Sequence, residues 1–475
     1  MTAPAVAPGD PLLTTAEAER AAEAVLLTAE RLADPARVAA VAGRPDNIEP
    51  IFGNPVWDPI SLTHGHPGVA LLHGELAWRD PDRAHAAHAH LAVALDEMPR
   101  RPSNGLNYGP AAIAAAVGVA AGPLGHYAGL RDRLTAWIAQ DQQTRLAVHR
   151  QRRAEGLPGV PWAAYDVVNG LTGTGRLLLD AAHLDGDPRA AEALTATLRH
   201  LVALAEPLTV DGVTVPGWWV SPEFEPVDQD RRDYPRGDFN AGLAHGIAGP
   251  LMLLSLAERR GLGVPGGAAA AETVAEWLLG WTLHDGTGPY WPCRVSWDEQ
   301  TAPVRPEAAF TRSAWCYGAP GVAVALHQAG LAFDRPHWRA AAVAGLRAVL
   351  ARDEREWRLD GPTFCHGFGG LLQMLHRVAA DSGDPVLRDG VRRMALRVLE
   401  FADPDAPFVF HHLTSDHPEG WRHATSHRRL DVAGVLEGAA GAALALLSVV
   451  PDALLGPQPL PEGPRAQWDR ALLVA

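Results

Sequence analysis

The segment HGIAGPLMLLSLA, residues His245–Ala257, decides the fold because six other segments of the chain share its pattern. Each segment has a leading glycine, usually a second glycine three residues later, and then an apolar run. The spacing of the leading glycines varies between 44 residues (Gly65 to Gly109) and 76 residues (Gly170 to Gly246), which leaves room for two helices in every interval. The seven leading glycines are Gly65, Gly109, Gly170, Gly246, Gly318, Gly367 and Gly438.

Amphipathic stretches such as PRAAEALTATLRHLVALAE separate the glycine segments, and their apolar residues recur every three or four positions. That period is typical of a helix with one buried face, whereas the glycine segments are apolar nearly all round and suit helices buried on every side. Seven buried helices alternating with seven amphipathic ones predict an all-α fold. We expect an α/α toroid, a double ring of seven inner and seven outer helices, forming a single domain over residues 1–475. Closure would hide the ends that an open repeat array must cap.

One stretch departs from the helical pattern. Residues 207–240, PLTVDGVTVPGWWVSPEFEPVDQDRRDYPRGDFN, are rich in Val, Trp, Pro and Gly, and TVDGVTV predicts a hairpin with an Asp-Gly turn. We interpret this stretch as a loop or small β insertion ahead of the fourth repeat, placed to act as a lid. The stretch HDGTGPYWPCRVSWDEQ, which begins at His284, has a similar composition.

The composition excludes several classes of protein. The 475 residues carry 41 basic and 55 acidic side chains, a net charge of −14, and every basic side chain other than histidine is an arginine. This balance argues against nucleic-acid binding, which needs a basic stripe, and against docking on anionic lipid. No apolar run reaches the length of a transmembrane helix, and the N-terminus lacks the order of a secretory signal. Three cysteines do not make a disulfide framework, so we expect a reducing cytoplasm.

Side chains with metal-binding or acid/base chemistry stand at four of the repeat starts. Two thiols and an imidazole are ligands that zinc prefers, and three protein ligands leave the open fourth position of a catalytic site. Adjacent Cys365 and His366 would point about 100° apart on a regular helix, so they could share one metal only at an irregular helix start. If the repeats are equivalent, these side chains converge on one end of the inner ring: Cys316 and Tyr317 before Gly318, Cys365 and His366 before Gly367, His245 before Gly246, and Asp166 four residues before Gly170.

Each of these residues also has a purely structural interpretation. A lone cysteine is commonly a small buried hydrophobe, His245 could cap a helix, and Asp166 could be an N-cap before VVNGL. We interpret Cys293, in a loop rich in Trp and Pro, as a packed or exposed thiol. The histidine-dense stretch HHLTSDHPEGWRHATSH, which begins at His411, is interpreted as a solvated loop, with a second metal site as the alternative.

The segments GLAHGIAGP, RSAWCYGAPGVA, FCHGFGGLL and YDVVNGLTG resemble the signature segments of the LanC family, the lanthionine synthetase C-like cyclases. The resemblance extends over all seven repeats, and the Trp-Cys-Tyr-Gly and Cys-His-Gly motifs are its most specific parts. It implies the α/α toroid, a catalytic zinc and thioether ring formation on a ribosomally made peptide. It further implies that Cys316, Cys365 and His366 bind Zn²⁺, that Asp166 and His245 form an acid/base pair, and that Arg312 and Tyr317 lie beside the metal. Trp315 matches the pattern as well, and a structural role is open to it.

The reaction that this resemblance implies is a Michael addition, in which a peptide cysteine thiol attacks dehydroalanine or dehydrobutyrine in the same dehydrated precursor peptide. We expect a stand-alone lanthipeptide cyclase whose partner is a separate dehydratase. Which of His245 and Asp166 is the acid and which the base stays open.

Three alternatives also stay open. One is a toroidal glycosidase or terpene-type cyclase, whose chemistry depends on carboxylates. The others are a peptide-binding scaffold with structural zinc and a relative that adds a small thiol such as glutathione to dehydroamino acids.

Overall fold

The computed structural model describes residues 11–50, 53–101, 104–122, 125–416, 426–458, 460, 465 and 467–474. The chain divides into two compact units, each assembled from two segments. The first unit contains Met1–Arg131 and Arg358–Trp468, and the second contains Asp132–Trp357 and Asp469–Ala475. Helix α6 (Ala128–Ala154) carries the chain from the first unit into the second. The prediction of a single domain stays a prediction.

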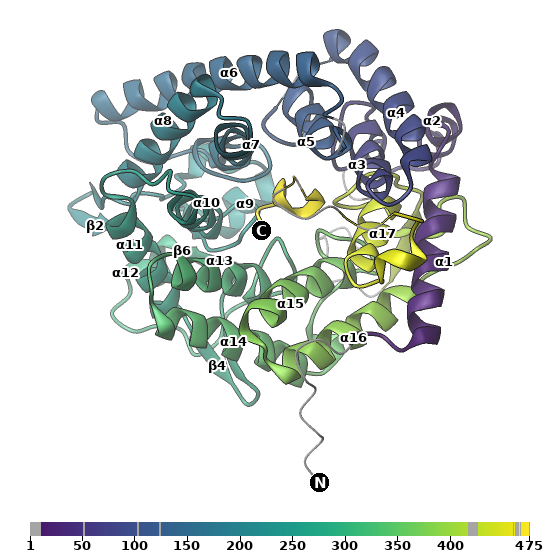
Figure 1. Ribbon diagram of the computed structural model, residues 1–475. Coiled ribbons are helices and arrows are strands. Elements are labelled where there is room, and N and C mark those ends of the chain that lie inside the picture. The colour runs from purple at the N-terminus through teal and green to yellow at the C-terminus, as the bar shows by residue number, and fades with distance from the viewer. Residues whose placement is uncertain are drawn as a thin grey trace. The chain divides into compact units, whose positions relative to one another are not determined.

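In its described residues, the first unit is built around four buried helices (Figure 1). Helix α17 packs against α1, α3 and α15, while α3 packs against α4 and α5 and α15 packs against α16. Every residue of α3 and of α17 is buried, which confirms the prediction from their all-round apolar character. The buried helices are α3 (His66–Ala77), α5 (Pro110–Ala120), α15 (Phe368–Ser382) and α17 (Ala439–Leu447), and the others are α1 (Thr15–Arg31), α2 (Pro35–Ala42), α4 (Ala84–Glu97) and α16 (Pro385–Leu399).

The second unit repeats this arrangement with three buried helices. Helix α10 packs against α7, α11 and α13, and α13 packs against α14. The outer helix α8 shows how the sequence sets a helix start: Pro188 occupies the first turn, and the Asp187 side chain accepts hydrogen bonds from two backbone N–H groups. The buried helices are α7 (Leu171–Leu184), α10 (Ala248–Arg259) and α13 (Ala319–Ala332), the outer ones are α6, α8 (Pro188–Leu204), α11 (Gly267–Gly280) and α14 (Pro336–Ala351), and the short ones are α9 (Asp228–Asp233) and α12 (Trp297–Thr301).

The repeat glycines lie at the starts of the buried helices. Six of the seven leading glycines are N-cap residues, and the seventh, Gly246, comes directly before the N-cap of α10, Ile247. A Cβ atom at Gly170 would collide with the backbone of Asp166, and one at Gly318 would collide with the carbonyl oxygen of Arg312. The loop that precedes each of these helices therefore folds back tightly against the helix start.

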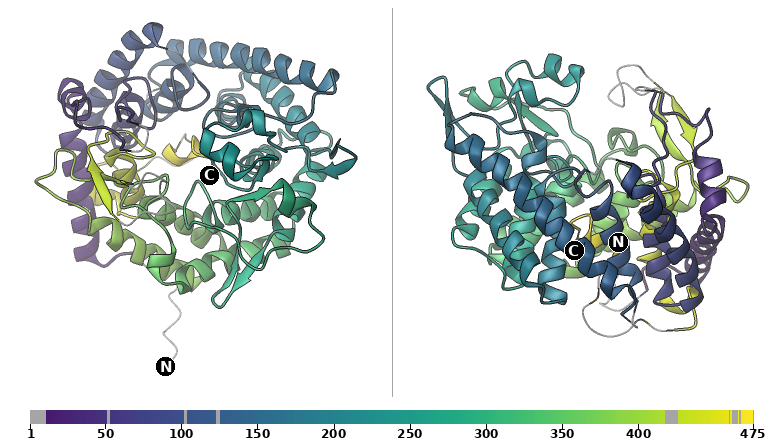
Figure 2. Two further views of the ribbon diagram at one scale, coloured as in Figure 1. Left: turned by 180° about the vertical axis from the view of Figure 1, so that it is seen from behind. Right: turned by 90° about the horizontal axis from the view of Figure 1, so that it is seen from above.

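Within the described residues, the strands form four two-stranded antiparallel ladders, and the turned views of Figure 2 show some of them clearly. The predicted hairpin in residues 207–240 is confirmed: Asp211 and Gly212 both have positive φ, 50° and 79°, as a tight Asp-Gly turn requires. The ladders pair β1 (Leu208–Val210) with β2 (Val213–Val215), β3 (Asp238–Asn240) with β6 (Arg294–Ser296), β4 (Leu283–Asp285) with β5 (Gly288–Tyr290), and β7 (His412–Ser415) with β8 (His427–Leu430).

None of the helices in the described ranges combines the length and the apolar character that a membrane span requires.

Three buried histidines of the first unit form a neutral cluster. His90 Nε2 lies 2.8 Å from the Leu32 carbonyl oxygen and donates to it, so its Nδ1 accepts from His66 Nδ1 at 2.8 Å. His73 stacks on His90, with ring centroids 6.1 Å apart. Burial lowers the pKa values of His66 and His73 to about 3 and that of His90 to about 4.

Replacing Gly318 by Ala is expected to destabilise the protein more than replacing Gly261 by Ala. Both glycines have positive φ, 83° and 69°, but only at Gly318 does a new Cβ meet backbone, because nothing lies within 4 Å of a Cβ at Gly261. We expect a loss of about 1 kcal/mol for Gly261→Ala and of about 3 kcal/mol for Gly318→Ala, measured by urea unfolding. Equal losses would show that the loop ahead of α13 can shift to make room.

The histidine cluster predicts a loss of stability in acid. The pKa of each of the three histidines in the folded protein lies below the unfolded value of about 6.5. The free energy of unfolding is therefore highest above pH 6.5 and falls as the pH drops toward 4, because the unfolded chain then binds protons that the folded protein does not. His73→Leu removes one such group, and its unfolding free energy should fall less between pH 7 and pH 5 than that of the wild type, by up to about 1.4 kcal/mol per pH unit. His85→Leu, at an exposed histidine of α4, is the matched control and should follow the wild type.

Candidate functional site

The loops that lead into the buried helices carry the polar side chains of the site. The residue directly before the leading glycine is polar in all seven repeats. In the first unit these residues are His64, Tyr108, His366 and Glu437, and in the second unit they are Asn169, His245 and Tyr317.

Asp166 and His245 form a hydrogen-bonded pair in the second unit. His245 Nδ1 lies 2.7 Å from Asp166 Oδ2, and the other carboxylate oxygen accepts the backbone N–H of Asn169 at 2.8 Å. Asp166 is fully buried, whereas the side chain of His245 is 25% exposed and stacks on Trp162, with ring centroids 4.7 Å apart. Because Nδ1 donates to the carboxylate, Nε2 is the nitrogen left free for proton transfer. The N-cap interpretation of Asp166 is wrong: the N-cap of α7 is Gly170, no side chain caps this helix, and Asp166 instead accepts the N–H of Asn169 in the loop ahead of it.

Cys316 and Tyr317 lie in the loop ahead of α13, next to the loop that carries His245. The carbonyl oxygen of Cys316 accepts the backbone N–H groups of Leu243 and Ala244, at 3.1 and 3.3 Å. Tyr317 OH accepts a hydrogen bond from Asn240 Nδ2 at 3.2 Å. Burial raises the pKa of Tyr317 well above its usual value, so the phenol is neutral. These bonds fix the two loops to each other.

Two further residues of this loop are buried. Arg312 is 3% exposed, and Trp315, which is fully buried, donates its indole N–H to the carbonyl oxygen of Leu472 at 3.1 Å. That contact supports the structural role for Trp315. Cys293 is also buried, and its backbone bonds to Phe310 and Ala241, so of the two interpretations, a packed or an exposed thiol, the packed one is correct.

The predicted insertion, residues 207–240, is linked to Trp162 through a buried cluster of charged side chains around Arg294. Arg294 pairs with Asp238 and with Glu225, whose carboxylate oxygen lies 2.5 Å from the guanidinium, and its guanidinium lies 5.3 Å from the centre of the Trp162 ring. Burial raises the pKa of Glu225 to about 8. Residues of the predicted insertion thus support the aromatic ring on which His245 stacks, and a lid role for this segment stays a prediction.

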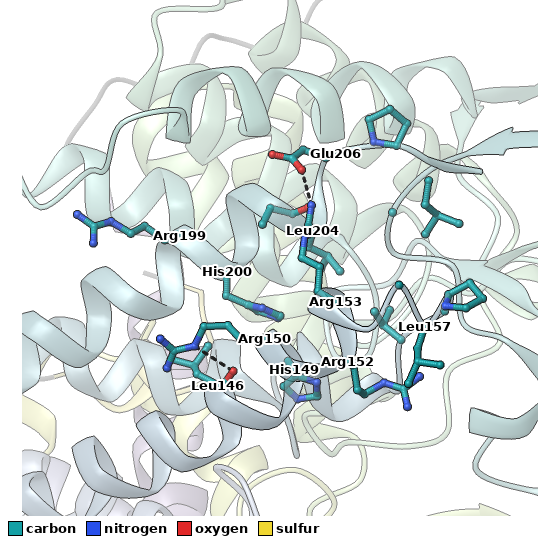
Figure 3. Close-up of a pocket in the computed structure, with 18 of the residues that line it drawn as sticks. Leu146, His149, Arg150, Arg152, Arg153, Leu157, Arg199, His200, Leu204 and Glu206 are labelled. Carbon is teal, nitrogen blue, oxygen red and sulfur yellow. Dashed lines mark hydrogen bonds and ion pairs between the residues drawn. The ribbon is translucent and has the colours of Figure 1, made fainter. Parts of the chain in front are cut away.

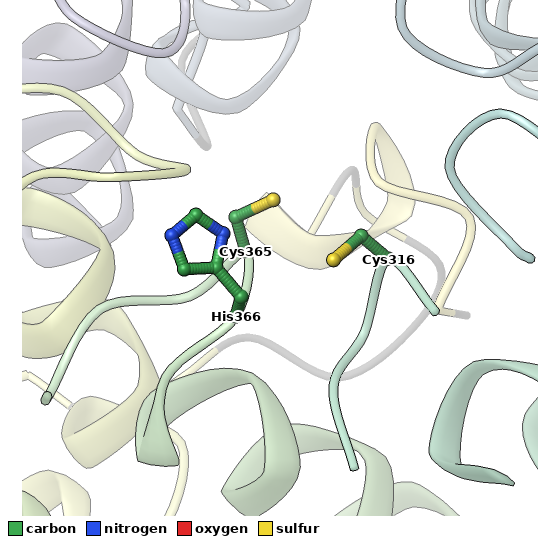
Figure 4. A group of neighbouring side chains, drawn as sticks. All are labelled: Cys316, Cys365 and His366. Carbon is green, nitrogen blue, oxygen red and sulfur yellow. The ribbon is translucent and has the colours of Figure 1, made fainter. Parts of the chain in front are cut away.

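Cys365 and His366 lie in the first unit, in the turn directly ahead of α15, whose N-cap is Gly367. The Cys365 N–H donates to Leu436 O at 2.7 Å, and the His366 carbonyl accepts the N–H of Asp360 at 2.9 Å. The two residues therefore avoid the divergent directions of a regular helix, as a shared metal requires. Figure 4 draws these two side chains and that of Cys316.

A polar cluster that the sequence pattern did not predict lies beside His366. Ligand atoms of His366, His412 and Glu437 all lie within 4.8 Å of one another, and His64 Nε2 lies 2.8 Å from Glu437 Oε2. Burial lowers the pKa of His412 to about 4. Burial raises the pKa of Glu437, but the hydrogen bond from His64 and the nearby imidazoles outweigh it, so the pKa is lowered. His64 and Glu437 each come directly before a leading glycine, as His245 does. This shared position in the repeat is the sequence signal that could have marked them as candidate site residues.

The interpretation of the stretch beginning at His411 as a solvated loop is wrong at residues 411–415, which are buried or half-buried and include β7, whereas Asp416, Ser426 and His427 are exposed. His412 is 4% exposed on β7, His411 Nδ1 lies 2.9 Å from Asp431 Oδ1, and His427 Nε2 lies 3.0 Å from Asp360 Oδ1. Strand pairing turns these imidazoles toward carboxylates of distant segments. Residues 417–425 lie outside the described part of the chain.

Comparison with known proteins identifies the family. The family model of lanthionine synthetase C-like proteins matches residues 56–454, and the chain belongs to this family. It is 25% identical to the nisin biosynthesis protein NisC of Lactococcus lactis subsp. lactis over 320 residues, which cover 66% of this chain and 72% of NisC. The solved structure of nisin cyclase matches with a TM-score of 0.68 at 21% identity, over 88% of this chain and 92% of that one. The predicted fold class, the all-α α/α toroid, is thereby confirmed.

Proposed function

We propose that this protein is a zinc-dependent lanthipeptide cyclase, which adds cysteine thiols of a dehydrated precursor peptide to dehydroalanine or dehydrobutyrine. One observation carries the proposal: in a chain of the lanthionine synthetase C-like family, Asp166 orients a partly exposed His245 beside the Cys316 loop. Family membership supports cyclase activity. The zinc dependence and the reaction are our inferences.

We propose Cys316, Cys365 and His366 as the three protein ligands of the zinc (Figure 4). Two thiols and an imidazole fit zinc, and each side chain lies just ahead of a helix N-terminus, where the helix dipole favours the thiolate. Bound there, zinc would lower the pKa of a substrate thiol and leave it nucleophilic through the charge of two thiolate ligands. Cys293, which is buried near Tyr317, is not assigned as a ligand.

In the addition, the peptide thiol gives up its proton, its sulfur forms a bond to the β-carbon of the dehydro residue and the carbon–carbon π bond breaks, so that the one proton lost from sulfur is balanced by the one gained at the α-carbon. The electron pair moves into an enolate, whose α-carbon then takes a proton. His245 Nε2 transfers that proton, since Nδ1 is held by Asp166. Asp166 acts as a positioning residue, because it is buried and both of its carboxylate oxygens are already bonded.

Arg312 and Tyr317 assist from the same loop. A guanidinium stays charged in protein interiors and offsets negative charge on the enolate. Tyr317 accepts its hydrogen bond from Asn240, so its own O–H remains able to donate. We propose a separate dehydratase as the source of the dehydro residues and a reducing cytoplasm as the setting, where the two ligand cysteines stay reduced.

Metal content tests the zinc ligands. The purified wild type should hold about one zinc per chain by elemental mass spectrometry, and Cys316→Ala and Cys365→Ala should each lose it. Cys293→Ala removes a buried cysteine of the same chain and should keep the metal. Zinc retained by both ligand variants would contradict the assignment.

Thiol counting tests the reaction. Incubation of a dehydrated peptide carrying one cysteine should remove its maleimide-reactive thiol without changing the peptide mass, because cyclisation is an isomerisation. If added glutathione is joined to the peptide while its own cysteine stays free, the small-thiol alternative is correct instead.

Asp166→Asn should slow cyclisation about 100-fold or more while the zinc content stays at the wild-type level, because the asparagine amide does not sustain the imidazolium form of His245. The rate is measured by the same thiol count across pH 6 to 8. A variant with unchanged rate and pH profile would remove the pair from the mechanism.

A further inference from the structure

A groove of about 430 Å³ lies in the second unit, formed by the end of α6, the loop 155–160, α8 and β1 (Figure 3). Apolar side chains contributed by all four segments line much of it. These are Leu146, Leu157, Pro158, Val160, Leu204 and Leu208. Leu157 is 47% exposed, so part of the apolar lining is open to solvent.

Four arginines surround this groove, and three of them have no carboxylate partner among the described residues. Arg153 is paired with Glu206 and bonds to the carbonyl oxygen of Ala203. Arg150 bonds only to the carbonyl oxygen of Leu146, and the Arg152 guanidinium lies 4.7 Å from the centre of the Phe224 ring. Arg199 is exposed, and its side chain has no hydrogen bond or ion pair within the described ranges.

The positive charge of the groove comes from these arginines and not from its histidines. His149 and His200 line it with ring centroids 5.4 Å apart, and burial lowers the pKa of each to about 4, so both are neutral near pH 7. A concentration of unpaired arginines is unusual in a chain whose net charge is −14. Such a site favours a ligand with carboxylates, which arginine binds through two parallel hydrogen bonds.

The groove is connected by the chain to the candidate catalytic pair. Its wall, the loop 155–160, continues directly to Trp162, which stacks on His245, and to Asp166. His200 Nε2 donates to the carbonyl oxygen of Ala164 at 3.0 Å, between those two residues. A peptide held in the groove therefore lies beside the segment that positions His245.

We propose that this groove docks an acidic, amphipathic segment of the substrate peptide, an inference that rests on the proposed function. Apolar side chains of the segment would pack on the leucine and valine lining, and its Asp or Glu carboxylates would pair with Arg150, Arg152 and Arg199. Charge complementarity selects this occupant, because a basic segment would be repelled by the arginines and a purely apolar one would leave them unpaired.

Two fluorescein-labelled synthetic peptides of ten residues test the docking, one of Leu and Glu and one of Leu and Gln in the same order. Fluorescence anisotropy with the full-length wild type should show that the Glu peptide binds about tenfold more tightly than the Gln peptide at low salt. The difference should shrink at high salt, because the arginines are exposed. Equal binding of the two peptides would overturn the proposal.

Charge reversal locates the binding. Arg199→Glu should weaken binding of the Glu peptide about tenfold, whereas Arg133→Glu, the same change at an exposed arginine of α6 outside the groove, should not. Equal effects of the two variants would also overturn the docking proposal. Zinc content and cyclisation are measured on the same preparations, so a wild type that binds the Glu peptide but forms no thioether contradicts the proposed function and leaves the docking site standing.

Discussion

The close approach of backbone to backbone at the helix starts is the constraint on which the rest of the structure depends. At Gly170 and Gly318 the preceding loop occupies the space that a Cβ would need, so only glycine allows the loop to fold back there. The loop and the first helical turn then form one rigid corner. The residue just before each glycine is thus presented at a helix start and is not carried on a mobile connection.

The same corners position the chemistry. The Cys316 carbonyl holds the loop that carries His245, while Asp166 uses one carboxylate oxygen for the backbone and the other for the imidazole. Glu225 and Asp238 of the insertion pair with Arg294, whose guanidinium lies over the Trp162 ring. The proposed acid/base pair needs no special helix geometry, because backbone hydrogen bonds already fix the loops that carry Asp166 and His245.

Buried charge is used differently in the two units. In the first unit, burial keeps a cluster of histidines neutral, and His64 and Glu437 pair at two repeat starts. In the second unit, Arg294 forms ion pairs with three carboxylates. Arg150 and Arg199 have no carboxylate partner among the described residues. Ion pairing in this acidic chain is therefore uneven, and the unpaired arginines gather on a groove whose wall runs on to the candidate catalytic pair.

The sequence by itself determined the seven buried helices, the hairpin at Asp211–Gly212 and the candidate residues at the repeat starts, because glycine, turn and helix signals act over a few neighbouring positions. It did not determine the pairing of His64 with Glu437, which are 373 residues apart, the burial of His412 or the arginine groove. Those features depend on which distant segments pack together. Only the tertiary structure decided them, since a side chain finds its partner and loses its solvent only after the helices have packed.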